Sequence, residues 1–179
     1  MLRGRCACNA VAYEVSDQFV AALNCHCSNC RAATGSAFLP WGEIAREKLR
    51  VTKGEGSLMV IGDADANHAM RCGECGSLLY WTVGDGTYVR VAYGSLIDEP
   101  ELKPTAHIFV GSKAPWHEIL DDLPRCSFRR LPRSVVEFEE VTHLGKPATD
   151  EADRPQLSLF GSGPTESKLS WGGTLHLRS

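Results

Sequence analysis

Seven of the eight cysteines in this 179-residue chain gather in three short clusters, and each cluster has the spacing of metal ligands. They form a Cys-x-Cys pair, a Cys-x-Cys-x-x-Cys triplet and a Cys-x-x-Cys pair followed by glycine: Cys6 and Cys8; Cys25, Cys27 and Cys30; Cys72 and Cys75. Two pairs together supply the four thiolates of a closed structural zinc site, whereas a triplet leaves one of four positions open for chemistry. We therefore expect two zinc ions (Zn2+) per chain, one structural and one catalytic.

The two pairs can each direct both sulfurs to one side. In an extended segment, residues two apart share a face, so Cys6 and Cys8 would point the same way. A Cys-x-x-Cys turn closed by Gly76 curls around a metal. The competing interpretation of Cys72 and Cys75 is a thioredoxin-like redox pair, which needs a βαβ context that this sequence lacks.

The triplet leaves two alternatives open. His26 lies between Cys25 and Cys27 and could be a fourth ligand, although its side chain should point away from both if the segment is extended. The other alternative is that the pairs bind one structural metal and the triplet consists of reduced thiols.

Composition indicates one ordinary globular domain. Apolar residues make up 43% of the chain, charged residues 23%, and the net charge is −3, so nothing points to nucleic acid or a membrane as a partner. The first twenty residues contain no continuous apolar run, so we expect neither signal peptide nor anchor, and a cytoplasmic location. In such a reducing compartment cysteines stay free to bind metal.

Short alternating runs separated by turns predict a mainly β domain over residues 1–141. Strands are expected at 11–15, 58–61, 77–83, 87–93, 107–110 and 135–141. Gly84-Asp85-Gly86 predicts a hairpin between two of them. Short helical pieces are expected at 27–33 and 45–49. Residues 142–179 are rich in Pro, Gly, Ser and Thr, and we expect a poorly ordered C-terminal tail.

Three further side chains could have chemical roles but belong to no recognised motif. Cys126 stands alone, and a lone cysteine is usually a small buried apolar residue. His107 and His117 are interpreted as structural histidines.

Several stretches, in order, resemble the glutathione-dependent formaldehyde-activating enzyme (GFA) family, whose domain the centromere-protein-V-type proteins share. These stretches are Cys6-Ala7-Cys8-Asn9-Ala10-Val11, Cys25-His26-Cys27-Ser28-Asn29-Cys30-Arg31, Gly35-Ser36-Ala37-Phe38, Cys72-Gly73-Glu74-Cys75-Gly76-Ser77, His107-Ile108-Phe109-Val110 and Ser112-Lys113-Ala114-Pro115-Trp116. Asn9 departs from the glycine usual in the family, but asparagine tolerates left-handed backbone.

The resemblance implies a Mss4-like, zinc-stapled β-sheet domain (a β-tent) with few short helices. It implies that the two pairs are the structural zinc set and that Cys25, Cys27 and Cys30 are the catalytic set. The implied activity joins glutathione and formaldehyde into S-hydroxymethylglutathione, the work of a carbon–sulfur lyase.

The residues fit such chemistry, because an open three-thiolate zinc can take a substrate thiol and lower its pKa. Arg31 and Lys113 are candidates for binding the carboxylates of glutathione, from their sequence neighbourhood and the family motif. The alternatives are a thiol or aldehyde carrier, a zinc-stabilised binding module without catalysis, and a reductase of the methionine sulfoxide type with Cys126 as its nucleophile.

Overall fold

The computed structural model describes residues 1–62 and 67–127, and these residues are mainly β. The strands are β1 (Leu2–Arg5), β2 (Ala12–Val15), β3 (Ala21–Cys25), β4 (Leu39–Ala45), β5 (Leu49–Lys53), β6 (Leu58–Gly62), β7 (His68–Cys72), β8 (Leu78–Val83), β9 (Tyr88–Ala92), β10 (His107–Ile108) and β11 (Arg125–Cys126). The helices are α1 (Ser28–Thr34) and the 3-10 helices η1 (Arg46–Lys48), η2 (Glu55–Ser57), η3 (Tyr93–Ser95) and η4 (Val110–Ser112). The predicted mainly β fold is confirmed. Within the described ranges, no helix is long and apolar enough to cross a membrane.

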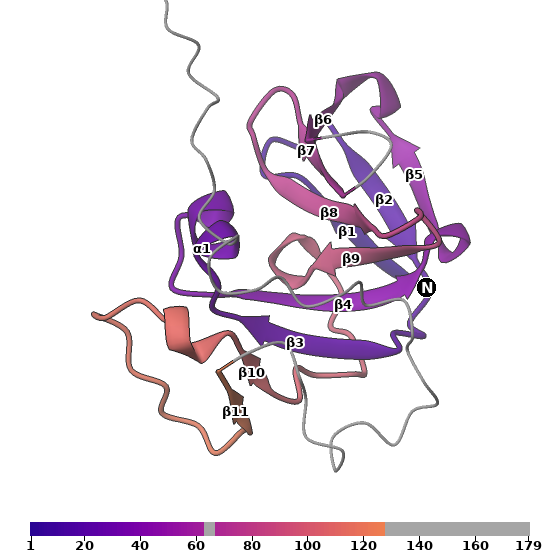
Figure 1. The fold of residues 1–179 in the computed structure, drawn as a ribbon. Coiled ribbons are helices and arrows are strands. Elements are labelled where there is room, and N and C mark those ends of the chain that lie inside the picture. The colour runs from indigo at the N-terminus through magenta and orange to yellow at the C-terminus, as the bar shows by residue number, and fades with distance from the viewer. Residues whose placement is uncertain (63–66, 128–179) are drawn as a thin grey trace, which may run out of the picture. The chain divides into compact units, whose positions relative to one another are not determined.

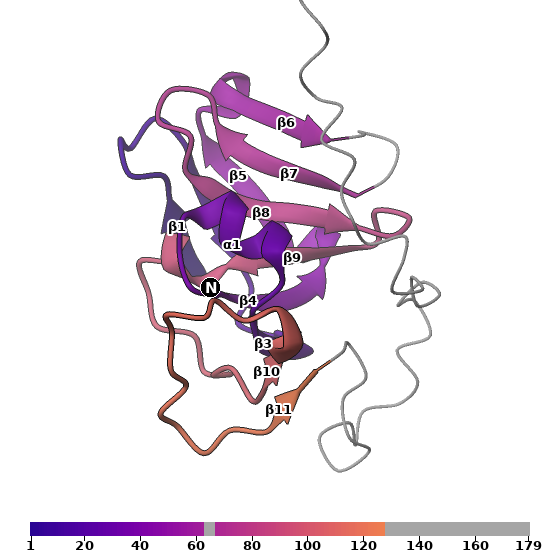
Figure 2. The same ribbon diagram turned by 60° about the vertical axis from the view of Figure 1, so that its left-hand side comes forward.

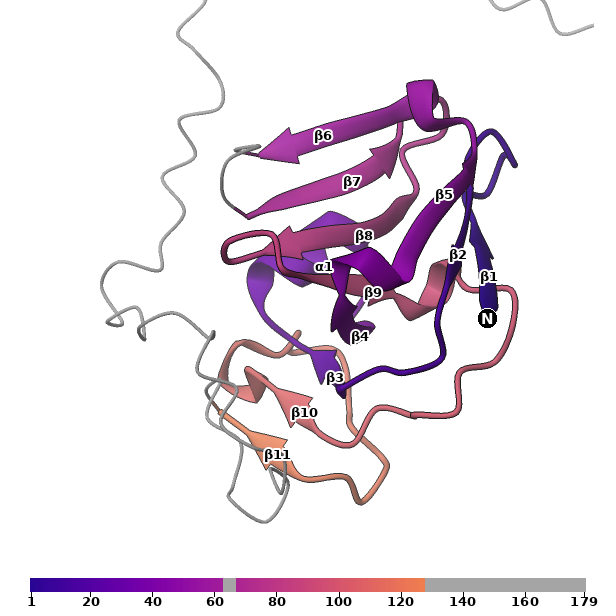
Figure 3. The ribbon, with the colours of Figure 1, turned by 90° about the vertical axis from the view of Figure 1, so that its right-hand side faces the viewer.

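The strands form two sheets. A three-stranded sheet has the order β1-β2-β5, and an eight-stranded sheet has the order β11-β10-β3-β4-β9-β8-β7-β6. β10 pairs in parallel with β3 and with β11, and the other pairings between strands are antiparallel. Figure 3 shows β1, β2 and β5 running steeply across the direction of β6, β7 and β8. Helix α1 follows β3 and lies beside the start of β4 (Figures 1 and 2).

The main core joins side chains of both sheets. It contains, among others, Val11, Tyr13, Val15, Ile44, Leu79, Val89 and Val91. The Tyr13 ring meets the Tyr80 ring edge-on with centroids 6.2 Å apart, and its hydroxyl lies 2.6 Å from the Ser95 hydroxyl. Tyr13 therefore fills apolar space while its one polar atom is satisfied, as a buried tyrosine requires.

Gly4 of β1 makes room for that ring. A Cβ atom built on Gly4 would lie 2.1 Å from Cζ of Tyr13, which no side chain can occupy without displacing the ring. The absence of a side chain at this position thus lets β1 approach the tyrosine of the strand it pairs with.

The sequence predicted several elements correctly. The helix expected at 27–33 is α1, the expected hairpin joins β8 to β9, and Gly84 and Gly86 have φ values of 62° and 87°. The piece expected at 45–49 is only the 3-10 helix η1. The predicted strand at 135–141 and the tail 142–179 lie outside the described residues.

One local expectation was wrong. Cys6 and Cys8 do not lie on an extended strand, because β1 ends at Arg5 and the chain turns, with the Asn9 N–H donating to the Cys6 carbonyl at 3.3 Å. Turn geometry, and not strand alternation, brings their sulfurs together.

Candidate metal centres

Four cysteine sulfurs converge where the ends of β1 and β7 meet. Cys6 and Cys8 follow β1, Cys72 ends β7, and Cys75 lies in the turn toward β8. The four sulfurs lie within 4.8 Å of one another, and the Cys8 sulfur is 3.5 Å from that of Cys6 and 3.7 Å from that of Cys72. A tetrahedral zinc with bonds of about 2.3 Å to sulfur has sulfur–sulfur edges of about 3.8 Å. These four side chains, the four-sulfur cluster, therefore fit a metal ion of that kind.

Asn9 shapes the first half of the four-sulfur cluster. Its φ of 62° is left-handed, as the sequence suggested for the residue that replaces glycine here. Nη1 of Arg5 donates to the Asn9 side-chain oxygen at 2.6 Å, and Nζ of Lys53 donates to its carbonyl at 2.7 Å. These contacts hold the turn while the Val11 N–H points at the Cys6 sulfur, 3.2 Å away.

Ser77 connects the two halves of the cluster. Its hydroxyl accepts the Ala7 N–H at 3.1 Å and lies 3.1 Å from the Cys75 sulfur. That contact with sulfur lowers the pKa of the Cys75 thiol to about 5, because a hydrogen bond favours the thiolate. Gly76 supplies the left-handed turn between them, with φ of 73°. Cys75, in the second half of the cluster, is thus preorganised to bind a metal as a thiolate.

Three other sulfurs, of Cys25, Cys27 and Cys30, form a second group within 4.8 Å of one another. Cys25 is buried at the end of β3, Cys27 is the N-cap of α1, and Cys30 lies in its first turn. The Cys30 N–H donates to the Cys27 sulfur at 3.3 Å. The junction between strand and helix therefore positions all three ligands of this three-sulfur site.

The three thiols of the three-sulfur site do not all lose their protons readily unless a cation is bound. Hydrogen bonds from Cys25 and then Cys30 lower the pKa of Cys27 to about 3. The hydrogen bond with Cys27 raises the pKa of Cys25 to about 12. Hydrogen bonds with Cys25 and Cys27 raise the pKa of Cys30 as well. The first thiolate suppresses the next two, as neighbouring like charges do. Three thiolates held this closely fit a bound metal ion.

His26 points away from the three-sulfur site, as alternation along an extended segment predicts. Its Nε2 lies 2.7 Å from Nδ1 of His107, whose Nε2 lies 3.0 Å from the Asp121 carboxylate. The His26 ring also packs at a tilt against Phe38, with centroids 5.2 Å apart, and stacks against His117, with centroids 5.9 Å apart. Burial, followed by the nearby charge of His107, lowers the pKa of His26 to about 4, so the ring is neutral near pH 7. No motif in the sequence indicates this histidine–histidine–aspartate chain.

The remaining candidates lie around these groups. Arg31 is in the last turn of α1, and its Nε is buried with no hydrogen-bond partner among the described residues. Nζ of Lys113 donates to the carbonyls of Ala114 and His117. Their roles in substrate binding stay a prediction. Cys126 is buried on β11 in an apolar cluster, and burial raises the pKa of its thiol.

Comparisons with known proteins identify relatives of this chain. A sequence model of the family described as "Glutathione-dependent formaldehyde-activating enzyme" matches residues 1–112. A Colletotrichum graminicola protein named "Putative glutathione-dependent formaldehyde-activating enzyme" is 37% identical over 78 residues, which are 42% of this chain and 41% of that protein. The chain thus matches less than half the length of this curated relative. A crystal structure of a Rhodobacter sphaeroides protein is 24% identical, with a TM-score of 0.47, over 56% of this chain and 92% of that one.

Proposed function

The chain belongs to the glutathione-dependent formaldehyde-activating enzyme family, and on that basis we propose that it is a zinc-dependent carbon–sulfur lyase that joins glutathione to formaldehyde or another small aldehyde. The observation that carries the proposal is the three-sulfur site. Cys25, Cys27 and Cys30 converge apart from the four-sulfur cluster and supply one ligand fewer than a closed zinc site needs.

The reaction is an addition that needs no oxidant or reductant. The thiol sulfur forms a bond to the aldehyde carbon, the carbonyl π electrons move to oxygen, and the proton of the thiol ends on that oxygen. A zinc ion held by Cys25, Cys27 and Cys30 would offer a fourth position to the substrate thiol and lower its pKa toward neutral pH.

The residues of the chain hold this site in place and shield one side of it. Cys25 is only 3% exposed and is covered on both edges, because β3 pairs with β4 through Leu39 and with β10 through Ile108. Cys27 and Cys30 are partly exposed on the helix side. A substrate can therefore approach from the side of α1, and orientation of thiol and aldehyde there would supply much of the acceleration.

We assign the four-sulfur cluster to a structural zinc ion, which gives two ions per chain. The eight cysteines, all of them among the described residues, form no disulfide. A reducing compartment such as the cytoplasm suits this chemistry, because both metal sites need free thiolates.

Exchange spectroscopy tests the function directly. In a mixture of glutathione and formaldehyde, we expect the protein to speed the interconversion of free and S-hydroxymethyl glutathione beyond the rate in buffer. Cys27→Ser should abolish that acceleration, whereas Cys126→Ala, which removes a sulfur that belongs to neither metal group, should retain it. Equal rates with and without the wild-type protein would refute the proposed activity.

A further inference from the structure

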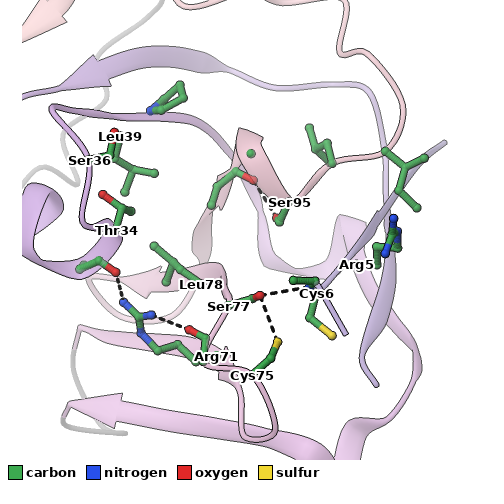
Figure 4. Close-up of a pocket in the computed structure, with 18 of the residues that line it drawn as sticks. Arg5, Cys6, Thr34, Ser36, Leu39, Arg71, Cys75, Ser77, Leu78 and Ser95 are labelled. Carbon is green, nitrogen blue, oxygen red and sulfur yellow. Dashed lines mark hydrogen bonds between the residues drawn. The ribbon is translucent and has the colours of Figure 1, made fainter. Parts of the chain in front are cut away.

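A pocket of about 630 Å3 lies between the four-sulfur cluster and the C-terminal end of α1 (Figure 4). Its size is in the range of pockets that hold small organic ligands, about 300–1,000 Å3. Leu39, Leu78 and Leu96 supply apolar wall, and Ser36 adds a hydroxyl. No residue of the three-sulfur site lines it.

Apart from the Cys6 and Cys75 sulfurs of the four-sulfur cluster, the ionisable side chains on the pocket wall are positive. Arg5 and Arg71 line the pocket, and no aspartate, glutamate or lysine does. The two Nη atoms of Arg71 donate to the carbonyls of Gly76, at 2.7 Å, and Ala33, and one Nη atom of Arg5 donates to the amide oxygen of Asn9. All of these acceptors are neutral, and neither arginine forms an ion pair with a described carboxylate. Both positive charges are therefore available to an anionic ligand, with N–H donors left to bind it.

The pocket is within reach of the three-sulfur site. α1 carries Cys30 in its first turn, whereas Ala33 and Thr34 at its other end line the pocket, and Thr34 Oγ1 donates to the Cys30 carbonyl at 2.8 Å. Four helical residues rise about 6 Å, and the middle residue of an extended tripeptide lies up to about 7 Å from either end. Leu39 lines the pocket and pairs with Cys25 across β3 and β4.

We propose that this pocket binds the carboxylate-bearing part of the thiol substrate, with Arg71 and Arg5 pairing its carboxylates while its sulfur reaches the three-sulfur site. This assignment rests on the proposed function of that site. Glutathione has a carboxylate at each end of its backbone and a thiol between them, which matches two cations placed apart in the lining of the pocket. Figure 4 shows Arg71 near Thr34 and Arg5 beside Cys6.

The test separates binding in the pocket from chemistry at sulfur. S-methylglutathione keeps both carboxylates but has no free thiol, so its affinity, measured by isothermal titration calorimetry, reports on the pocket alone. Arg71→Gln and Arg5→Gln should each raise its Kd by about tenfold or more, since hydrogen bonds to charged groups contribute about 1.5–3 kcal/mol. Arg50→Gln, which removes an exposed arginine of β5 outside the pocket, should leave the Kd unchanged.

Kinetics supply a second readout. Both pocket variants should raise KM for glutathione and leave KM for 2-mercaptoethanol, which has no carboxylate, unchanged. If the wild type does not bind S-methylglutathione, or both variants bind it as the wild type does, the assignment is overturned. Binding without any acceleration of thiol exchange would refute the proposed function and retain the pocket. Should Arg71→Gln lose zinc or unfold, Arg5→Gln decides, because its side-chain hydrogen bond to Asn9 is exposed and glutamine keeps N–H donors for that bond.

Discussion

Cys27 has two separable roles, and replacing it by serine or by alanine distinguishes them. Its sulfur is one of the three in the three-sulfur site and also the cap of α1, accepting the Cys30 N–H at 3.3 Å from an extended backbone with φ of −62° and ψ of 154°. Serine removes the sulfur but keeps an acceptor at the same place, and serine is among the preferred N-cap residues. Alanine removes both.

The difference between these two variants measures the cap. Loss of an N-cap acceptor costs about 1 kcal/mol, in a range of about 0.5–2 kcal/mol. For a chain of this size, about 1 kcal/mol shifts the melting temperature by about 2–4 °C. We expect Cys27→Ala to unfold at a lower temperature than Cys27→Ser by about that interval. Because both variants lose the same metal ligand, any contribution of bound metal cancels in the comparison.

The assay combines thermal unfolding with zinc content and thiol exchange. Each variant should retain the zinc of the four-sulfur cluster, lose that of the three-sulfur site and be inactive. Equal melting temperatures for the two variants would show that the cap does not form. An active Cys27→Ser variant would show that catalysis does not need the third sulfur.

Further predictions concern the fold. Cys72 is 0% exposed in the main core and belongs to the four-sulfur cluster, so Cys72→Ser should give insoluble or unfolded protein, because a structural zinc site contributes about 10–16 kcal/mol against a net stability of about 5–15 kcal/mol. Cys126→Ala is its control, and a soluble Cys72→Ser variant with native circular dichroism would contradict the structural assignment. Gly4→Ala should destabilise the protein by about 1–3 kcal/mol through the clash with Tyr13. Gly56→Ala, with nothing within 4 Å of its new methyl group, should change the urea midpoint little, and equal midpoints for both would refute the packing argument. The hydrogen bond from Arg3 lowers the pKa of Asp98 to about 2 from an ordinary value of 3.8. The ionised Asp98 carboxylate therefore contributes fully to stability above pH 3.8, and this contribution is lost as the pH falls toward 2. The difference in unfolding free energy between wild type and Asp98→Asn should therefore shrink over this range, and a constant difference would rule out the carboxylate as its cause.

Features of the fold were predictable where the determining residues are close in sequence. β2 has one face in the core, so its apolar residues alternate and the sequence reveals it. β3 and β4 are buried on both faces over most of their lengths, so their sequences show no alternation and were not recognised. The turn at Asn9 was predictable because the left-handed backbone that it needs is a property of this one residue.

The two cysteine groups were predictable for the same reason, whereas the pocket was not. The spacing within each cluster is local in sequence. Because a closed zinc site needs four ligands, the two distant cysteine pairs are expected to share one site. The pocket forms only where β1, the C-terminal end of α1 and β7 meet, which brings Arg5 and Arg71 into one lining. No pattern in the sequence around either arginine signals that meeting. The hydrogen bonds of His26 with His107 likewise depend on the parallel pairing of β3 with β10.

The positions of the two groups in the topology give a physical reason to assign them different work. The four-sulfur cluster links β1 of the smaller sheet to β7 of the larger one, and Cys8 and Cys72 are 64 residues apart. A metal there closes a long loop and removes chain entropy from the unfolded state. The three-sulfur site takes its ligands from a stretch of six residues, so a metal there closes almost no loop, and both edges of β3 are already paired in the sheet. Stability therefore explains the four-sulfur cluster but gives little reason for three buried or half-buried thiols beside α1. Binding and activating a substrate thiol does give one.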